Sequence, residues 1–177
     1  MSDRIKFNIK EYDFQGMVLN ALRKHDDLKG MECLEELHKH IKYFYKSKLE
    51  KLVYQLFRSK KFLEKYDALC SNIIAEKFKG AAKFQKIPSV RIHFPGQKSV
   101  NFHTDEWYGH GSDIRNFWLP LVNVYGSASL ATFNETKNSE VLTTLGLTEG
   151  LTIDLINKIC EEEATFLKCI PTWLDEG

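Results

Sequence analysis

The feature that most constrains this fold is a change of hydrophobic periodicity at Pro88. Before it, apolar residues recur at steps of three and four within residues 12–28, 34–56 and 62–78, which is the spacing of one face of an α-helix. After it, short runs of strand-forming residues alternate with turn dipeptides. Because proline pushes the preceding residue out of helical geometry, we expect the helical pattern to end there. The sequence therefore predicts an α+β fold in which a helical region, 1–87, supports a sheet.

The helical region carries no chemical motif. Its longest pattern predicts one apolar stripe that packs against the sheet, formed by Leu37, Ile41, Phe44, Leu52 and Leu56. His38 and His40 lie in the same pattern, but residues two apart on a helix face different directions and make a poor metal-binding pair. We therefore expect this region to brace the sheet.

Strand-forming runs follow Pro88 in close succession. They occupy residues 90–94, 99–103, 114–121, 121–124 and 129–133, and a helical pattern follows at 152–166. Pro95-Gly96 and Gly126-Ser127 are turn dipeptides between these runs. A chain of 177 residues has the length of one domain with its own core. We therefore predict a single domain, 1–177, whose second part, 88–177, holds the strands and a helical insertion near 140–166.

The pair His103 and Asp105 is the main candidate for chemistry. Side chains alternate between the two faces of a strand, so residues two apart point the same way. An imidazole and a carboxylate supply two of the three ligands of a 2-His-1-carboxylate iron site. A histidine and an aspartate recur at this spacing by chance in many chains, and a strand histidine hydrogen-bonded to a neighbouring carboxylate has the same pattern. The pair by itself therefore leaves both interpretations open.

The residues around this pair resemble a known family. A strand, the Pro-Gly turn, His-x-Asp, the loop Tyr108-Gly109-His110-Gly111 and the strand N-F-W-L-P-L together resemble the iron(II)/2-oxoglutarate-dependent oxygenases. The nearest group is the bacterial one associated with carbohydrate and aminoglycoside biosynthesis clusters. The resemblance covers residues 88–133, about a quarter of the chain. It implies a double-stranded β-helix, or jelly-roll, with N-terminal helices packed on it. It also implies iron(II), 2-oxoglutarate as co-substrate, and hydroxylation of a sugar or sugar-derived small molecule.

The resemblance also implies roles for particular residues. His103 and Asp105 become metal ligands and catalytic residues. The residues expected at the co-substrate pocket are Arg91, His93, Asn116 and Trp118. The residues expected to contact the substrate are Glu106, Tyr108 and His110. For each residue outside the metal pair, an ordinary barrel-filling or surface side chain is the alternative.

The chain departs from the family in one respect. The family places a second histidine on a late strand, followed by a basic residue that pairs with the distal carboxylate of 2-oxoglutarate. Beyond Asp105 the chain has one histidine, His110, and one arginine, Arg115, both close to the His-x-Asp strand. Residues 174–177 resemble the turn that leads into the distal histidine. We therefore expect the chain to be a fragment or a shortened oxygenase that is not competent by itself.

Two other classes of protein remain open. One is a non-catalytic jelly-roll protein that binds a ligand or acts as a scaffold and keeps the His-x-Asp pair without iron chemistry. The other is a metal-dependent enzyme of a different type, such as a cupin isomerase that uses His93, His103 and Asp105. The metal that the chain binds separates these classes.

Charge and cysteine content limit the partners. Residues 1–88 carry 19 Lys/Arg against 12 Asp/Glu, but these lysines are scattered along helical patterns, so we expect no nucleic-acid partner. No apolar run is long enough for a transmembrane helix, and no secretory signal is recognisable, so we expect no membrane partner. The widely spaced cysteines form no C-x-x-C pair and favour a reduced, cytoplasmic protein; they are Cys33, Cys70, Cys160 and Cys169. The sequence does not indicate an oligomeric state.

Overall fold

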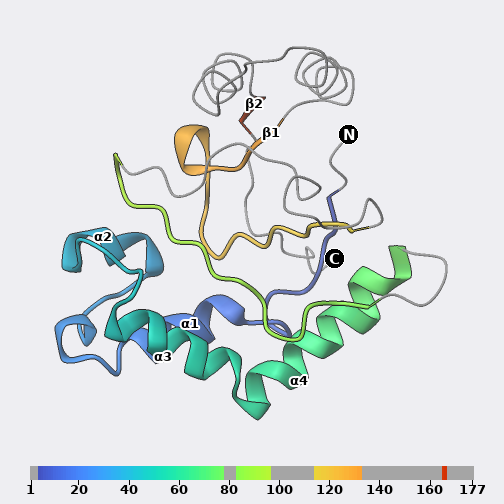
Figure 1. The fold of residues 1–177 in the computed structure, drawn as a ribbon, viewed down its shortest axis with the longest axis horizontal. Coiled ribbons are helices and arrows are strands. Elements are labelled where there is room, and N and C mark those ends of the chain that lie inside the picture. Colours follow the sequence, from blue (N-terminus) through green and yellow to red (C-terminus); the bar gives the residue numbers. More distant parts are fainter. Residues whose placement is uncertain (1–3, 78–82, 97–113, 133–164, 167–177) are drawn as a thin grey trace, which may run out of the picture.

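Four α-helices and one pair of short strands form the main regular structure of the described part of the chain (Figure 1). The computed structural model describes residues 4–77, 83–96, 114–132 and 165–166. The helices are α1 (Phe14–Leu22), α2 (Leu37–His40), α3 (Lys48–Phe57) and α4 (Lys60–Leu69), and the strands are β1 (Ala131–Thr132) and β2 (Thr165–Phe166). Short turns of 3-10 or π geometry lie at Asp26–Leu28, Leu34–Glu36, Cys70–Ile74, Ala75–Lys77 and Gly126–Ala128.

Three of the helices begin at a side-chain cap. Asp13, Ser47 and Ser59 each accept a hydrogen bond from the backbone N–H three residues further along, at 2.8, 3.2 and 3.3 Å. A cap of this kind satisfies one of the N–H groups that the first turn of a helix leaves without a partner. Asp13 caps α1 in this way, and the serines before α3 and α4 follow the same rule.

The longest helical pattern, 34–56, is interrupted, and the prediction of one helical stretch is wrong there. The chain leaves α2 at Ile41, whose backbone is extended, and Lys46 has a φ of 60° before Ser47 caps α3. The Glu50 carboxylate accepts a hydrogen bond from the N–H of Lys46, one residue before Ser47, and the Ser47 hydroxyl accepts one from the Glu50 N–H. Serine favours a cap over a helix interior, so the next helix, α3, begins directly after Ser47.

The restart changes which residues of this stretch are buried. The buried residues of α3 are Leu49, Val53 and Phe57, whereas the predicted stripe residues Leu52 and Leu56 are only half-buried. The other predicted members divide in the same way, since Leu37 and Phe44 are buried and Ile41 is half-buried; these three precede α3. The steps of three and four between apolar residues predicted the helical period of α3 correctly. The break before Ser47 decided which of its apolar residues face the core.

Of the other two helical patterns, the first, 12–28, is shorter in the structure, whereas the second, 62–78, is helical over its described residues. α1 ends at Leu22, and the Arg23 guanidinium then donates hydrogen bonds to the carbonyls of Met31 and Glu32, at 2.6 and 3.2 Å. These bonds hold the following loop against the helix, with Leu28 fully buried. α4 ends at Leu69, and the chain then continues through a π turn and a 3-10 turn to residue 77.

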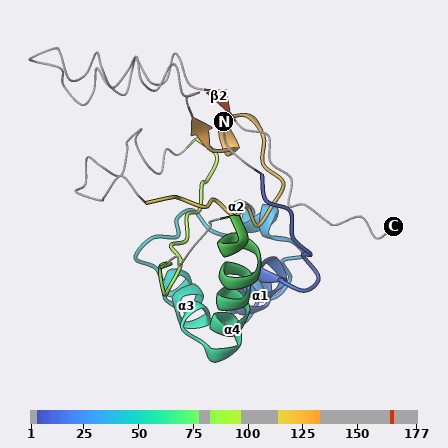
Figure 2. The ribbon, with the colours of Figure 1, turned by 90° about the vertical axis from the view of Figure 1, so that its right-hand side faces the viewer.

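The core lies between α1, α3 and α4, which form one layer of the molecule (Figures 1 and 2). Its centre is aromatic. Phe57 of α3 stacks on Phe62 of α4 with ring centroids 4.4 Å apart, and Phe14 of α1 lies 5.2 Å from Phe62. Burial of a side chain of this size away from water stabilises the folded state by about 1.5–3 kcal/mol. The helices therefore have a core of their own, and residues 83–96 add Val90 and Phe94 to it.

The segments after residue 82 are extended but contain little paired sheet. Residues 90–94 and 114–121, both predicted strands, form no ladder within the described residues, and Pro95-Gly96 makes the expected turn with Gly96 at a φ of 73°. Val124 makes a single bridge, and a 3-10 turn stands at the expected Gly126-Ser127 turn.

The one ladder in the described residues is antiparallel. Ala131 pairs with Phe166 and Thr132 with Thr165. The helix predicted for 152–166 is therefore wrong at its last two residues, because they pair with β1, and residues 152–164 lie outside the described residues. The jelly-roll and the single-domain organisation stay predictions, since strand 99–103 lies outside them too.

Candidate functional site

The structure describes the two segments that flank the predicted metal pair. His103 and Asp105 lie within residues 97–113, outside the described residues, as do Glu106, Tyr108 and His110. The four remaining site residues belong to the flanking segments, 83–96 and 114–132. Figure 1 shows segment 83–96 and the first part of segment 114–132 between the helical layer and the β1–β2 pair, which the end of segment 114–132 joins.

Tyrosine hydroxyls from the helical region hold the first of these segments. The Tyr45 hydroxyl donates a hydrogen bond to the Ile92 carbonyl at 3.2 Å and accepts one from the Ile92 N–H at 3.0 Å. The Tyr54 hydroxyl of α3 accepts a longer bond, of 3.5 Å, from the Val90 N–H. Side chains therefore supply to residues 90 and 92 the hydrogen bonds that a neighbouring strand supplies in a sheet.

A third tyrosine holds the start of the same segment. The Tyr66 hydroxyl of α4 donates to the Gln85 carbonyl at 2.9 Å, and its ring meets Phe84 edge-on at 5.9 Å between centroids. Burial raises the pKa of Tyr66, so its hydroxyl keeps its proton and stays a donor.

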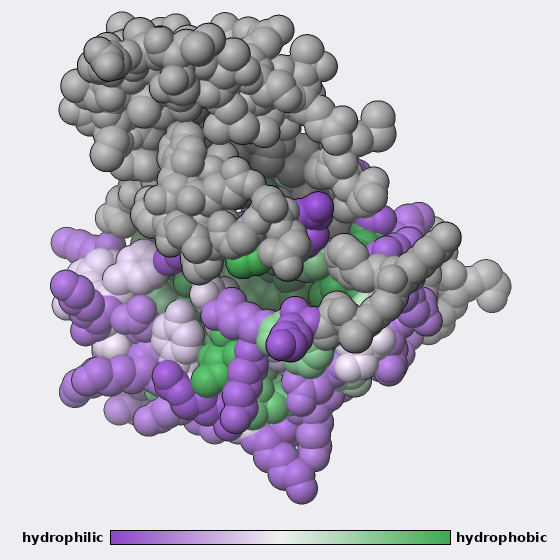
Figure 3. Space-filling model, turned by 45° about the vertical axis from the view of Figure 1, so that its right-hand side comes forward, coloured by the Kyte–Doolittle hydropathy of each residue, from purple (hydrophilic) through white to green (hydrophobic). Residues whose placement is uncertain are grey.

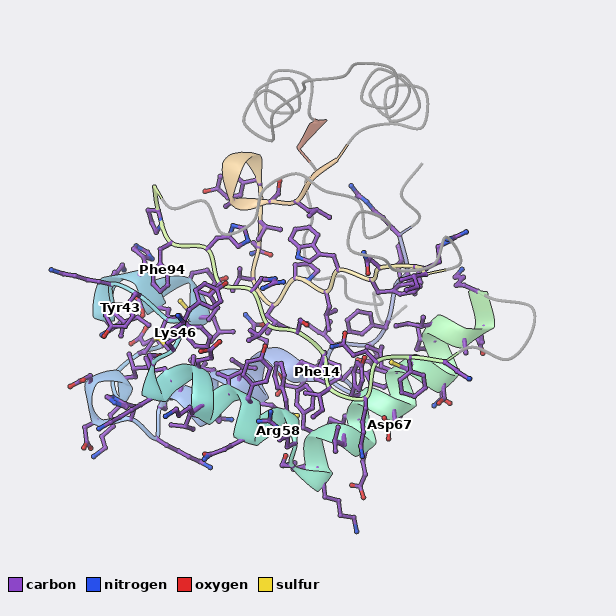
Figure 4. The ribbon with its side chains drawn as sticks, in the orientation of Figure 1. Phe14, Tyr43, Lys46, Arg58, Asp67 and Phe94 are labelled. Atoms are coloured by element: carbon purple, nitrogen blue, oxygen red, sulfur yellow. The ribbon has the colours of Figure 1, made fainter. Side chains whose placement is uncertain are left out.

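The alternation predicted for residues 90–94 is confirmed. Val90 and Phe94 are buried and Ile92 is half-buried, whereas Arg91 and His93 are exposed. Arg91 and His93 therefore share the face that is turned away from the helical core, and Figure 4 shows Phe94 beside the connection that carries Tyr43 and Lys46.

Arg91 and His93 lie close enough to influence each other. Desolvation by the surrounding protein lowers the pKa of His93, and the positive charge of Arg91 lowers it further. His93 is therefore neutral at pH 7, and a neutral imidazole has a lone pair that binds a metal or accepts a hydrogen bond. The planar guanidinium of Arg91 suits a carboxylate.

Asn116 and Trp118 are exposed on the second segment. Leu119 and Leu121 pack against the core, whereas residues 114–118 are all exposed. Trp118 is 39% exposed, and large apolar side chains of the same segment are exposed with it: Ile114, Phe117, Tyr125 and Leu130. Figure 3 shows apolar residues that reach the surface in the middle of a largely hydrophilic face. Both flanking segments thus turn their predicted site residues away from the helical core.

No complete metal site is found in the part of the chain that the structure describes, since no three His, Cys, Asp or Glu side chains converge there. His38 places its Nδ1 2.8 Å from the Glu35 carbonyl. Cys33 and Cys70 are free thiols, and burial raises the pKa of the Cys70 thiol. Within the same described ranges, no helix has both the length and the apolar character needed to cross a membrane.

The sequence did not reveal the three tyrosines as supports of segment 83–96. Tyr45, Tyr54 and Tyr66 have no common spacing, and all three lie in the helical patterns 34–56 and 62–78, where aromatic residues are ordinarily core. Their hydroxyls form hydrogen bonds with backbone groups that lie 19 to 47 residues further along the chain. No local pattern reports such a contact.

Comparison with known proteins gives one partial similarity to report. The chain is 35% identical over 51 residues to the streptomycin biosynthesis protein StrG of Streptomyces griseus. The matched stretch covers 28% of this chain and 26% of StrG. No family model and no solved structure matches the chain. The chain therefore shares a short stretch with a protein named for the biosynthesis of an aminoglycoside, and no family is established beyond that.

Proposed function

We propose that this chain belongs to an iron(II)- and 2-oxoglutarate-dependent dioxygenase that hydroxylates a sugar or sugar-derived small molecule. The observation that carries the proposal is the pair His103 and Asp105 within 88–133, the stretch that resembles these oxygenases. The partial similarity to StrG supports a place in the biosynthesis of sugar-derived compounds. The exposed positions of Arg91 and Asn116 support it too, because these residues lie in the segments on either side of the sequence that carries the pair.

The donor types in this stretch fit iron(II). Imidazole and carboxylate are the ligands of the facial triad, and open positions remain for a chelating co-substrate. When bound, iron with 2-oxoglutarate supplies the oxidation of a substrate C–H bond by dioxygen. His103 and Asp105 would hold the metal, and the chain's other residues bind and orient what surrounds it.

The flanking residues have chemistry suited to the co-substrate. The Arg91 guanidinium can form two parallel hydrogen bonds with a carboxylate of 2-oxoglutarate. The Asn116 amide can donate another hydrogen bond, and the Trp118 indole can exclude water from the reacting groups. Glu106, Tyr108 and His110 offer acceptors and donors for the hydroxyl groups of a sugar.

Metal binding tests the proposal directly. We expect the wild-type chain to bind iron(II) weakly under anaerobic conditions in calorimetry, and binding to strengthen when 2-oxoglutarate is present. His103→Ala and Asp105→Ala should each abolish it. His38→Ala is the matched control, because it removes an exposed imidazole from the helical region and should leave binding unchanged. Equal binding by wild type and both site variants would overturn the proposal.

A cupin-type metal enzyme is the second candidate, and His93 is the observation that favours it. Its imidazole is neutral at pH 7 and lies on the outward face of residues 90–94, and an imidazole is a ligand type that would complete a set of three with His103 and Asp105. The two candidates differ in the effect of 2-oxoglutarate. Metal binding that is lost in His93→Ala and is indifferent to 2-oxoglutarate would favour the cupin enzyme. Binding that is lost in His110→Ala would make His110 the third ligand of an oxygenase.

A further inference from the structure

The Tyr45 hydroxyl forms hydrogen bonds with a residue that is distant along the chain. It lies between α2 and α3, and its ring packs edge-on against the buried Phe44 with centroids 5.8 Å apart. Its hydroxyl extends to Ile92, 47 residues further along the chain, and makes bonds of 3.2 and 3.0 Å to the carbonyl and the N–H of that residue. A hydroxyl donates one proton and accepts through its lone pairs, so one side chain satisfies both backbone groups.

This arrangement replaces a strand. In an antiparallel ladder, a hydrogen-bonded residue exchanges both its N–H and its carbonyl with one residue of the neighbour. Tyr45 provides both bonds at position 92, and Tyr54 provides one at position 90. The backbone groups of alternate residues point to the same edge of an extended chain, so the two tyrosines close one edge of residues 90–94.

We infer that Tyr45 is a positioning residue for the site. By binding both backbone groups of Ile92, it keeps residues 90–94 extended, and it thereby holds Arg91 and His93 on the outward face, where they meet an anionic dicarboxylic co-substrate. The identity of this ligand rests on the proposed function. The positioning of the backbone rests on the hydrogen bonds alone.

The chain offers two controls for the tyrosine hydroxyl. Tyr43 is 68% exposed, and no hydrogen bond of its hydroxyl is found among the described residues, so Tyr43→Phe makes the same chemical change two residues away (Figure 4). Tyr66→Phe removes the bond to Gln85, at the other end of segment 83–96. This second control separates the loss of a hydrogen bond elsewhere in segment 83–96 from the loss of the hydrogen bonds that position residue 92.

The test compares Tyr45→Phe with both controls by three measurements. Amide hydrogen exchange reports the Ile92 N–H, three-bond couplings report whether Arg91 and His93 stay extended, and equilibrium dialysis with iron(II) under anaerobic conditions reports 2-oxoglutarate binding. For Tyr45→Phe we expect exchange of the Ile92 amide to accelerate roughly tenfold, the loss that one hydrogen bond produces. The two couplings should fall towards averaged values, and 2-oxoglutarate should bind several-fold more weakly. Tyr43→Phe should change none of these, and Tyr66→Phe should change exchange near Gln85 without changing the binding.

The outcomes separate the two parts of the inference. Unchanged exchange and couplings in Tyr45→Phe would overturn the positioning role. Changed exchange and couplings with unchanged 2-oxoglutarate binding would keep that role and overturn the ligand. A wild-type chain that binds neither iron(II) nor 2-oxoglutarate would overturn the proposed function and the ligand together, and the exchange and coupling results would still decide the role of Tyr45.

Discussion

The helices of residues 14–69 and the extended segments 83–96 and 114–132 satisfy their backbones in different ways. α1, α3 and α4 make their hydrogen bonds within the helix, and a side chain next to the first turn caps each of them. Segment 83–96 instead receives hydrogen bonds at Gln85, Val90 and Ile92 from tyrosines of the helical region. The helical region is therefore the support, and the extended segment depends on it.

This difference shows how the candidate site residues obtain their orientation. Alternation along an extended chain separates Arg91 and His93 from Val90 and Phe94, but alternation alone does not say which set faces inward. The core accepts the apolar set, and the tyrosines hold the backbone in that register. The comparison between the two regions leads to four predictions, given from the largest effect to the smallest.

Loss of the Phe62 ring should destabilise both regions together. Phe62→Ala removes a ring that contacts Phe14 and Phe57 in the centre of the helical core, so we expect the free energy of unfolding to fall by about 4 kcal/mol. Phe84→Ala is the matched control, since Phe84 is half-exposed and touches Tyr66 only at its edge, and it should cost about 1 kcal/mol. Urea denaturation followed by circular dichroism measures both. Equal losses would mean that the helical layer is not the support.

Phe94→Ala should show whether segment 83–96 can detach from the helices. Phe94 is 7% exposed and belongs to the core, so we expect its loss to cost about 3 kcal/mol. Hydrogen exchange should rise in segment 83–96 first, while the amides of α3 and α4 stay protected. His93→Ala removes an outward side chain from the neighbouring position and should leave this exchange pattern unchanged. If α3 opens together with the segment, the two regions form one cooperative unit.

Ser59→Ala should weaken the helical region locally. The Ser59 hydroxyl accepts a hydrogen bond from the Phe62 N–H at the start of α4, and removal of such a cap costs about 1 kcal/mol. Ser71→Ala, at an exposed position in the turn after α4, should stay within about 0.5 kcal/mol of wild type. Thermal unfolding of the two variants gives the comparison. A cap that contributed nothing would make α4 dependent on packing alone.

The smallest effect concerns pH and the extended segment. Because desolvation and Arg91 lower the pKa of His93, the unfolded chain binds a proton at His93 at a higher pH than the folded chain. The contribution of His93 to stability is therefore most favourable above its ordinary pKa of about 6.5, and it declines as the pH falls through that value. An NMR titration measures this pKa. Arg91→Gln should raise it towards the ordinary value, whereas Arg58→Gln, which removes a charge just after the end of α3, should not.

Parts of both regions were predictable from sequence because their causes are local. The caps at Asp13 and Ser59, the Pro95-Gly96 turn and the alternation of residues 90–94 each depend on neighbours within a few residues. The break at Ile41 was not predicted, since apolar steps of three and four continue across it. Thr165 and Phe166 were assigned to a helix, because their pairing with β1 depends on residues more than thirty positions away.

For this protein, the sequence by itself determined the helical period of α1, α3 and α4, the change of periodicity at Pro88, and the pairs of residues that share a face within 90–94. These follow from backbone geometry and nearest-neighbour chemistry, which act along the chain. Only the tertiary structure decided the phase of α3, the inward turn of Val90 and Phe94, and the use of three tyrosine hydroxyls as partners for segment 83–96. Each of these needs two distant parts of the chain to meet. A ring is buried only where a core surrounds it, and a backbone N–H outside a helix or ladder needs an acceptor from elsewhere in the chain.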